Sequence, residues 1–373
     1  MDSTELWLRL MTVTGLSGEK MLKAAGLYHS GVGISAALQR AGIAEKQQKQ
    51  FFSVTHKDLT FSQRWLEAPH RYLISADMAW YPPLLRAISW FPGALFVWGD
   101  PEALVTPQLA VVGSRSHSWY GKRWGHYFSY LMAKHGLTIS SGLALGIDGI
   151  AHRAALEASC KTVAVLGNGL GDIYPRRHKA LAHQIIEMGG AIVSEFPLLT
   201  PPWPGNFTRR NRIISGLSRG VLVVEAGLRS GSLVTARYAI EQGRDVFALP
   251  GAIGSPGSEG PHWLIKQGAI PVTSPEDIIE HLGNIPGLPP LTSETNNSFV
   301  ELEEAPLPFP HLLANVGDEV TPVDVVAERA GQPVPLTVAQ LLELELAGWI
   351  AAVPGGYVRL RRASHVRRTN VFI

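Results

Sequence analysis

Seven short apolar runs rich in valine, isoleucine and leucine recur between residues 109 and 274, and stretches with helical spacing lie between them. The runs read LAVVG, LTISSG, KTVAVLG, AIVSEF, GVLVVEA, RDVFALPG and AIPVTS. Strands that are covered on both faces are almost continuously apolar, and parallel strands need a crossover connection, which is usually a helix. The alternation therefore predicts an α/β domain built on a doubly wound parallel sheet.

The segments around these runs differ from them in composition. Residues 1–63 contain short helix-like stretches broken by glycine, and the run ALFVWGD predicts one more strand early in the central domain, 64–283. Residues 284–310 are rich in Pro, Ser, Asn and Glu, which is typical of a linker. In residues 311–373, two helical patterns precede a hairpin around Pro354-Gly355-Gly356 and an arginine-rich tail. This order predicts a winged-helix module.

Composition narrows the class of protein. Hydrophobic residues make up 46% of the 373 residues and charged residues 17%, which excludes a disordered chain and fits two or three globular domains. The lone cysteine, Cys160, excludes an intramolecular disulfide, and we expect a cytoplasmic protein. No apolar run approaches the roughly 18 residues that span a bilayer, and we expect neither a signal peptide nor a membrane partner. Because the net charge is only +2, any nucleic-acid site must be a local cluster.

Small polar residues follow the predicted strands at the edge of the sheet where ligands usually bind. In open parallel sheets that edge is formed by the carboxyl ends of the strands. Glycine turns let a ligand approach closely and let backbone N–H groups converge on it. The residues placed there are Ser114, Ser141, Gly142, Gly167, Asn168, Ser230, Gly231 and Ser232. They predict a polar groove suited to phosphate.

Positive charge gathers near the same edge. Arg115 directly follows the turn Gly113-Ser114, where a helix N-terminus would favour an anion and a guanidinium can bind phosphate through two N–H groups. The turn carries no G-x-G-x-x-G dinucleotide fingerprint. Further basic residues are Arg176, Arg177, Lys179, Arg209, Arg210, Arg212 and Arg219, with Asn211 among them. Each of these could instead belong to a solvated helix face.

Four side chains are candidates for catalysis. Asp148 and His152 are four residues apart, which suits a proton relay, half of a metal site, or a capping or packing contact. Glu195 and Glu225 end strands at the predicted groove, and each could act as a base, cap a helix or pair with an arginine. The chain lacks a G-x-x-x-x-G-K-[ST] loop, a G-x-S-x-G elbow and a set of clustered metal ligands. We therefore expect no P-loop chemistry and no metal.

Several longer motifs resemble a known family. They read VVGSRSHSWYG, ISSGLALGIDGIAHRAAL, TVAVLGNGLGDIYP, IVSEFPLLTPPWPGNFTRRNRIISGLS, LVVEAGLRSGSLVTARYAIEQGRDVFALPG and GPHWLIKQGA, and they span Val111–Ala269 in unbroken order. Over this span the chain is similar to DNA-processing protein A, the DprA/Smf family of bacteria. The resemblance implies an extended Rossmann-like central domain, a helical N-terminal domain of the sterile-alpha-motif or helix-hairpin-helix kind, and a C-terminal winged helix.

The same resemblance implies a function. Such proteins bind single-stranded DNA, protect incoming strands in natural transformation and help to load the RecA recombinase, without a cofactor or catalysis and as homodimers. By matching motifs, Arg115 falls on the family's phosphate-binding arginine, with Ser114 and Gly142 on the pocket walls. Arg210-Asn211-Arg212 falls on an arginine-asparagine-arginine segment, and the region from Arg176 to Lys179, which includes Arg177, falls on a basic DNA contact. Candidates for base stacking are Trp119, Tyr120, Trp203 and Phe207, each of which could instead pack internally.

Two alternatives remain at this point. The first is a phosphoribohydrolase-like enzyme of the lysine-decarboxylase-like group, whose P-G-G-x-G-T-x-x-E motif ends in a catalytic glutamate. Here Thr235 is followed by Ala236, Arg237 and Tyr238, so that glutamate is missing. The second is a winged-helix regulator that reads duplex DNA. Its predicted recognition helix, Leu336 to Leu346, contains two glutamates and no Lys or Arg, which favours a protein-contact or regulatory role.

Overall fold

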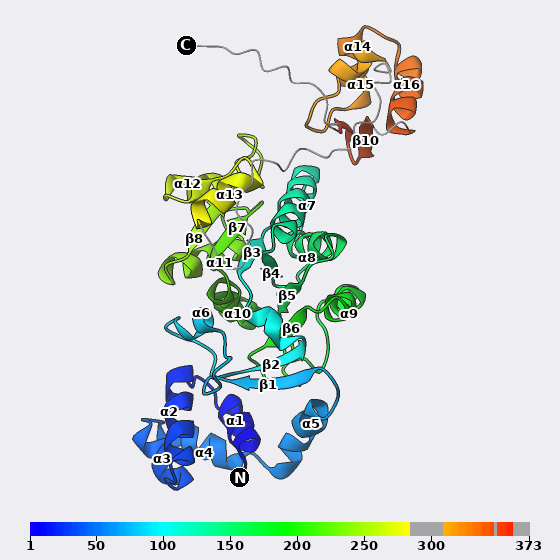
Figure 1. The fold of residues 1–373 in the computed structure, drawn as a ribbon. Helices are drawn as coiled ribbons and strands as arrows, with labels where there is room; N and C mark the ends of the chain where they lie inside the picture. Colours follow the sequence, from blue (N-terminus) through cyan, green and yellow to red (C-terminus); the bar gives the residue numbers. More distant parts are fainter. Residues whose placement is uncertain (284–308, 347–348, 361–373) are drawn as a thin grey trace. The chain divides into compact units, whose positions relative to one another are not determined.

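The computed structural model describes residues 1–283, 309–346 and 349–360 (Figure 1). The chain divides into two compact units, Met1–Leu291 and Thr292–Ile373. Most of the predicted linker 284–310 lies outside the described residues, and so does the arginine tail with Arg361, Arg362, Arg367 and Arg368.

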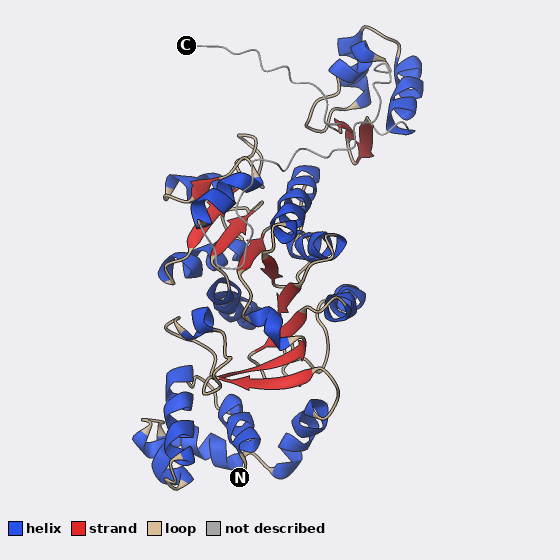
Figure 2. Cartoon of the chain, viewed as in Figure 1, coloured by secondary structure: helices blue, strands red, loops and turns tan. Residues whose placement is uncertain are grey.

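Within the described part of the first unit, a nine-stranded sheet has the order β1-β2-β6-β5-β4-β3-β7-β8-β9 (Figures 1 and 2). Every neighbouring pair from β6 to β9 in this order is parallel, and these strands coincide with the seven apolar runs. They are β3 (Gln108–Val112), β4 (Thr138–Ser141), β5 (Thr162–Val165), β6 (Ala191–Ser194), β7 (Gly220–Val223), β8 (Asp245–Ala248) and β9 (Ile270–Pro271). The prediction of a doubly wound parallel sheet is confirmed.

An antiparallel hairpin extends this sheet beyond β6. Strand β2 (Ala94–Gly99), expected from its apolar run, pairs antiparallel with β6, and β1 (Arg71–Ser75) pairs with β2. The sequence analysis did not predict β1, whose first three residues are not buried.

Helices cover both faces of the sheet, as a doubly wound topology requires (Figure 2). Along β3, Leu109 and Val111 enter one core cluster, whereas Ala110 and Val112 enter the cluster on the other face. The helices after β1 are α6 (Pro83–Arg86), α7 (Trp119–Lys134), α8 (Ile147–Glu157), α9 (Lys179–Glu187), α10 (Pro204–Leu217), α11 (Gly231–Glu241), α12 (Glu259–Lys266) and α13 (Pro275–Leu282), with 3-10 turns η1 (Pro101–Leu104) and η2 (Arg176–His178). This two-sided burial explains why the strands read as continuous apolar runs.

The N-terminal helical domain packs against the β1–β2 hairpin. Its helices are α1 (Ser3–Thr12), α2 (Gly18–His29), α3 (Ile34–Arg40), α4 (Glu45–Ser53) and α5 (His56–Leu66). Buried Trp7 and Leu10 of α1 belong to the same core cluster as Ile74 and Leu95 of the hairpin. The side chain of Ser17 accepts the N–H of Lys20 and so caps α2 after the glycine turn. The helical domain is therefore joined to the sheet by a shared core.

The second unit is a winged helix, as predicted. It contains α14 (Pro310–Ala314), α15 (Val323–Ala330) and α16 (Val334–Leu346), followed by the antiparallel strands β10 (Ile350–Val353) and β11 (Gly356–Arg359). Its core includes Leu313, Val326, Leu341, Leu344 and Ile350. Among all described residues, none of the helices has the length and apolar character needed to cross a membrane.

Candidate nucleic-acid interface at the carboxyl edge of the sheet

In the sheet, β4 to β6 lie on one side of β3, and β7 to β9 lie on its other side. The strand order therefore reverses between β3 and β7, and the carboxyl ends of these two strands form the topological switch point. The turn after β3 is tied to its neighbours there. The Ser114 N–H donates to the Glu225 carbonyl at 2.7 Å, and the Ser232 hydroxyl donates to the Gly113 carbonyl at 2.8 Å. Ser230 caps α11 by accepting the Ser232 N–H. The polar residues predicted in these two turns therefore lie together, and their hydrogen bonds mainly fix the two turns to each other.

The N-terminus of α7, which the sequence analysis expected to bind an anion, is occupied by a carboxylate of the protein itself. Glu225 accepts the Ser118 N–H at 3.0 Å and also the Ser118 hydroxyl. The same hydroxyl accepts the Gly121 N–H, and a Cβ at Gly121 would collide with the Glu225 carboxylate. Of the three roles left open for Glu225, helix capping is the one in the structure. This helix terminus is therefore not open to a ligand anion.

Beyond that turn, Arg115 is exposed and lies against an aromatic pair. Its guanidinium carbon is 5.7 Å from the centroid of the Phe207 ring, and the Tyr174 ring is 5.7 Å from Phe207 on α10. Phe207 packs directly over Gly167 in the turn after β5, where a side chain would clash with the ring. Tyr174 is 45% exposed. We call Arg115, Tyr174 and Phe207 the Arg115 cluster.

Two buried groups of opposite charge, Arg210 and Asp148, lie on either side of the backbone at Gly142 without forming a direct ion pair. Arg210 donates to the carbonyl of Gly142, just after β4, at 2.8 Å and to the carbonyl of Val165, the last residue of β5. Asp148 accepts the Gly142 N–H at 3.0 Å, and burial raises the pKa of its carboxyl against the opposing effect of Arg210. Burial lowers the pKa of Arg210 to about 10, with Asp148 opposing and the positive charge of Arg115 adding to the shift. The effect of Arg115 on the pKa of Arg210 indicates that the two positive charges are near each other. An anion bound at Arg115 would therefore be attracted by both charges.

Arg210, Asn211 and Arg212, predicted as phosphate contacts, are each less than one-tenth exposed. Asn211 accepts the Arg210 Nε–H at 3.1 Å and donates to the Gly231 carbonyl at 3.1 Å. The structure thus places this segment beneath the groove, where its donors are engaged by the protein. Their exposed neighbour is Arg209, whose side chain is 48% exposed.

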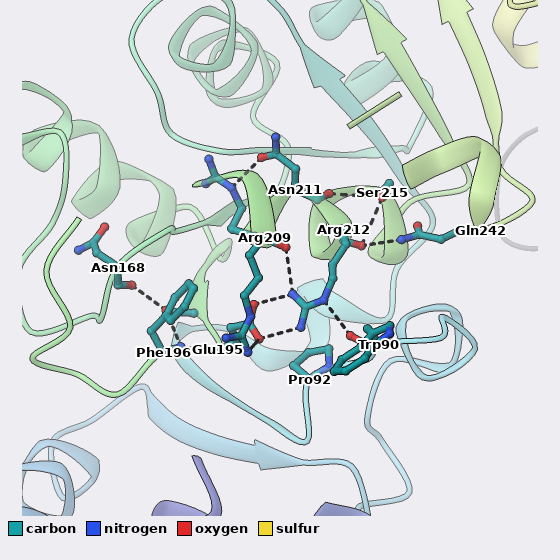
Figure 3. A network of polar contacts seen from close by, with 12 residues as sticks. Trp90, Pro92, Asn168, Glu195, Phe196, Arg209, Asn211, Arg212, Ser215 and Gln242 are labelled. Atoms are coloured by element: carbon teal, nitrogen blue, oxygen red, sulfur yellow. Dashed lines mark hydrogen bonds and ion pairs between the residues drawn. The ribbon is translucent and has the colours of Figure 1, made fainter. Parts of the chain in front are cut away.

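Glu195 is paired with two arginines rather than poised as a base (Figure 3). Arg212 approaches it through two N–H groups, at 2.5 and 2.7 Å, and Arg209 approaches at 2.8 Å. Arg212 also donates through Nε to the Trp90 carbonyl at 2.8 Å (Figure 3). Arg212 therefore fastens α10 to the segment that precedes β2.

The Asp148 and His152 pair has the packing role. The His152 Nδ1 lies 2.7 Å from the Thr162 hydroxyl in the interior, and burial lowers the pKa of this histidine to about 3. No group of three or more His, Cys, Asp or Glu side chains suited to a metal ion occurs among the described residues.

The remaining predicted residues divide into buried and exposed sets. Ser141 donates its hydroxyl to the Val111 carbonyl at 2.7 Å, and Asn168 donates to two carbonyls of its own turn. Arg177 and Lys179 are exposed on η2 and at the start of α9. The buried His178 between them contacts the Leu143 carbonyl at 2.9 Å, which sets this basic segment beside the turn after β4.

Tyr174 is the one member of the Arg115 cluster that the sequence analysis did not single out. Its place in the motif DIYPRRHK, directly before basic residues, is the signal that could have drawn attention to it. Two of the four stacking candidates, Trp119 and Tyr120, are part of α7, where the Tyr120 hydroxyl donates to the Pro250 carbonyl. Trp203 is 63% exposed.

The chain combines an open α/β sheet, which has a basic carboxyl edge with aromatic residues, with a small helical domain and a winged helix, and this combination defines a class of α/β protein with accessory modules. A family model described as DNA recombination-mediator protein A matches residues 72–283. Models described as the SMF/DprA SAM domain and the DprA winged helix domain match residues 1–64 and 302–356. The chain belongs to the DprA/Smf family.

Individual relatives agree with this assignment. Protein Smf of Escherichia coli is 62% identical, with the whole of both chains covered. The solved structure of DNA processing protein A from Streptococcus pneumoniae is similar with a TM-score of 0.67 and 34% identity, covering 76% of this chain and 100% of that one. A Helicobacter pylori DNA processing protein A, described as binding single-stranded DNA, has a TM-score of 0.51 and 31% identity over 57% of this chain and 96% of its own.

Proposed function

We propose that this protein binds single-stranded DNA along the carboxyl edge of its sheet and mediates recombination without catalysing a reaction. The observation that carries the proposal is the Arg115 cluster. It presents an exposed guanidinium, Arg115, beside an exposed ring, Tyr174, and a partly buried ring, Phe207, with the buried positive charge of Arg210 nearby. The description of the Helicobacter pylori relative as a single-stranded DNA binder supports it.

The chemistry of the cluster favours an unpaired strand over a duplex. Exposed rings can stack on bases only when the bases are not already stacked and paired with a complement, and such stacking tolerates any sequence. Arg115 and the nearby basic residues Arg177 and Lys179 supply phosphate contacts, which depend strongly on salt. We therefore expect tight, sequence-tolerant and salt-sensitive binding of single strands.

The candidate acid–base groups support a role without catalysis. Glu195 is ion-paired, Glu225 caps a helix, and Asp148 and His152 are buried in the structural contacts described above. In the phosphoribohydrolase comparison, the position of the catalytic glutamate is held by Tyr238. Incubation with nucleoside monophosphates, followed by chromatography, should yield no free base; release of base would favour the enzyme.

Protein partners form the second part of the proposal. The description of the matched family model as a recombination mediator supports a role in loading the RecA recombinase. Helix α12, which precedes the last strand β9, exposes 47% of Trp263, and an exposed aromatic side chain of this kind supports a homodimer contact. Helix α16 exposes an apolar stripe with Val338, Leu342 and Leu346, which suits contact with protein better than with DNA. Cytoplasmic location remains our expectation from the single free cysteine.

Binding assays with the full chain test the DNA proposal. Fluorescence polarisation with a 20-nucleotide oligothymidylate and with a duplex of the same length should show much tighter binding to the single strand. Arg115→Ala removes one charge-assisted contact worth about 1.5–3 kcal/mol, so affinity should fall by about 10- to 150-fold. Arg237→Ala is a matched control, because Arg237 is exposed on α11, where it contacts Glu241 and the Tyr238 ring. Equal affinity for both DNA forms, or equal loss in both variants, would contradict the proposal.

A further inference from the structure

A cleft of about 290 Å³ lies between the N-terminal helical domain and the central domain. The turn between α1 and α2 forms one wall, with Thr12, Thr14 and Ser17 among its residues. The segment before β2, the loop after β6 and the start of α10 form the other walls. Two indoles among them, Trp90 and Trp203, are 60% and 63% exposed.

The walls of this cleft are held close together by specific contacts. A Cβ at Gly18, the first residue of α2, would collide with the Phe91 carbonyl oxygen, and a Cβ at Gly93 would collide with the Met21 side chain. Only glycine permits this approach of α2 to the segment before β2. The Arg212 Nε–H bond to the Trp90 carbonyl fixes the same segment to α10 (Figure 3). The cleft is therefore built into the fold of the first unit.

Helix α10 connects the cleft to the Arg115 cluster. Trp203 is the N-cap residue of this helix and lines the cleft, whereas Phe207, one turn later, belongs to the Arg115 cluster. One helical turn rises about 5.4 Å, so the backbones of Trp203 and Phe207 are close together at the start of α10. A strand bound at the Arg115 cluster is therefore near Trp203.

The cleft also has the chemistry of a nucleotide site. Its charged groups are Arg209, Arg212 and one carboxylate, Glu195, which leaves a net positive charge. The side chain of Glu195 is 3% exposed and satisfied by both arginines, whereas that of Arg209 is 48% exposed and can bind a phosphate as well. Two accessible indoles beside an accessible guanidinium match the base and phosphate of an unpaired nucleotide.

We propose that this cleft binds the nucleotides that follow those at the Arg115 cluster, so that the N-terminal helical domain is part of the single-stranded DNA site. The inference rests on the proposed function, since it extends the same strand. It assigns Trp90, Trp203 and Arg209 to DNA contact and makes the footprint longer than the sheet edge alone.

The test compares oligothymidylates of 5 and 20 nucleotides on the full chain. Trp203→Ala and Trp90→Ala should leave the affinity for the 5-mer unchanged and weaken the 20-mer by roughly 5-fold or more, the loss typical of one stacked base. Trp203→Phe keeps a ring and should restore most of the 20-mer affinity. Trp80→Ala is the control and should change neither, because Trp80 is a similarly exposed indole, at 46%, that does not line the cleft.

The outcomes separate this inference from the proposed function. Arg115→Ala should weaken both lengths, and its failure to do so would overturn the sheet-edge site itself. Unchanged 20-mer affinity in both cleft variants would overturn the cleft inference alone and would leave the cleft to a ligand other than DNA. An equal loss for both lengths would also overturn it. Because both indoles are more than half exposed, the variants should fold, which circular dichroism would verify.

Discussion

We expect Arg210 to support DNA binding indirectly, because its hydrogen bonds hold the turns after β4 and β5 in place. In Arg210→Met the carbonyls of Gly142 and Val165 lose their donor, and Asp148 stays buried without its nearby positive charge. Two buried carbonyls without a donor, together with a buried carboxyl that has lost its nearby positive charge, should cost about 3–5 kcal/mol. For a unit of this size, at roughly 2 °C per kcal/mol, the melting temperature should fall by about 6–10 °C.

Differential scanning calorimetry of the full chain measures this effect, with Arg237→Met as the control. Arg237 is exposed and its ion pair with Glu241 is long, at 3.6 Å, so its loss should cost less than about 1 kcal/mol. The penalty in Arg210→Met should shrink on acidification. Burial raises the pKa of Asp148, and loss of the Arg210 charge should raise this pKa further. Below that pKa the folded variant holds the Asp148 proton more tightly than the unfolded chain does, which stabilises the variant. This stabilisation is lost as the pH increases. Equal melting temperatures for the two variants at pH 7 would refute a structural role for Arg210.

Three further substitutions test the edge of the sheet. Gly146→Ala should destabilise the first unit by 1 kcal/mol or more (an order-of-magnitude value) and weaken DNA binding, because Gly146 has φ +84° and a Cβ would strike the Ser114 carbonyl; unchanged melting would contradict this. Glu225→Gln should cost about 0.5–2 kcal/mol in thermal unfolding, because it removes the anion at the N-terminus of α7, and a gain in stability would count against the capping role. Burial lowers the pKa of His152 to about 3, so the unfolded chain binds a proton that the folded chain does not, and the free energy of unfolding should fall by about 1.4 kcal/mol per pH unit between pH 6.5 and 3. In urea titrations, the stability of His152→Gln should fall less steeply over this pH range. An equal pH dependence in both proteins would exclude this role of His152.

The fold followed from the sequence because the strands are covered on both faces. Most of the parallel strands are short apolar runs, and glycine-containing turns follow β3, β4, β5, β7 and β8. The strand β1 was missed because RYLIS is only partly buried and lacks that pattern. Its place beside β2 depends on long-range pairing, which a local pattern does not encode.

The candidate site was predictable in position but not in the role of each side chain. Arg115 could be placed because it follows a glycine turn at the end of a strand. In the sequence, Arg210 and Arg212 look like surface arginines that bind phosphate, yet tertiary contacts bury both side chains. Whether Glu225 caps a helix or faces a ligand depends on α7, more than a hundred residues earlier in the chain. Such roles arise from contacts across the fold, which spacing along the chain does not report.

A crystal structure of the full chain with bound oligothymidylate tests the central claim most directly. The account predicts a phosphate within hydrogen-bonding distance of the Arg115 guanidinium and a base against the Phe207 or Tyr174 ring, with the strand intact. A strand bound on another face of the molecule, with the Arg115 cluster untouched, would contradict it.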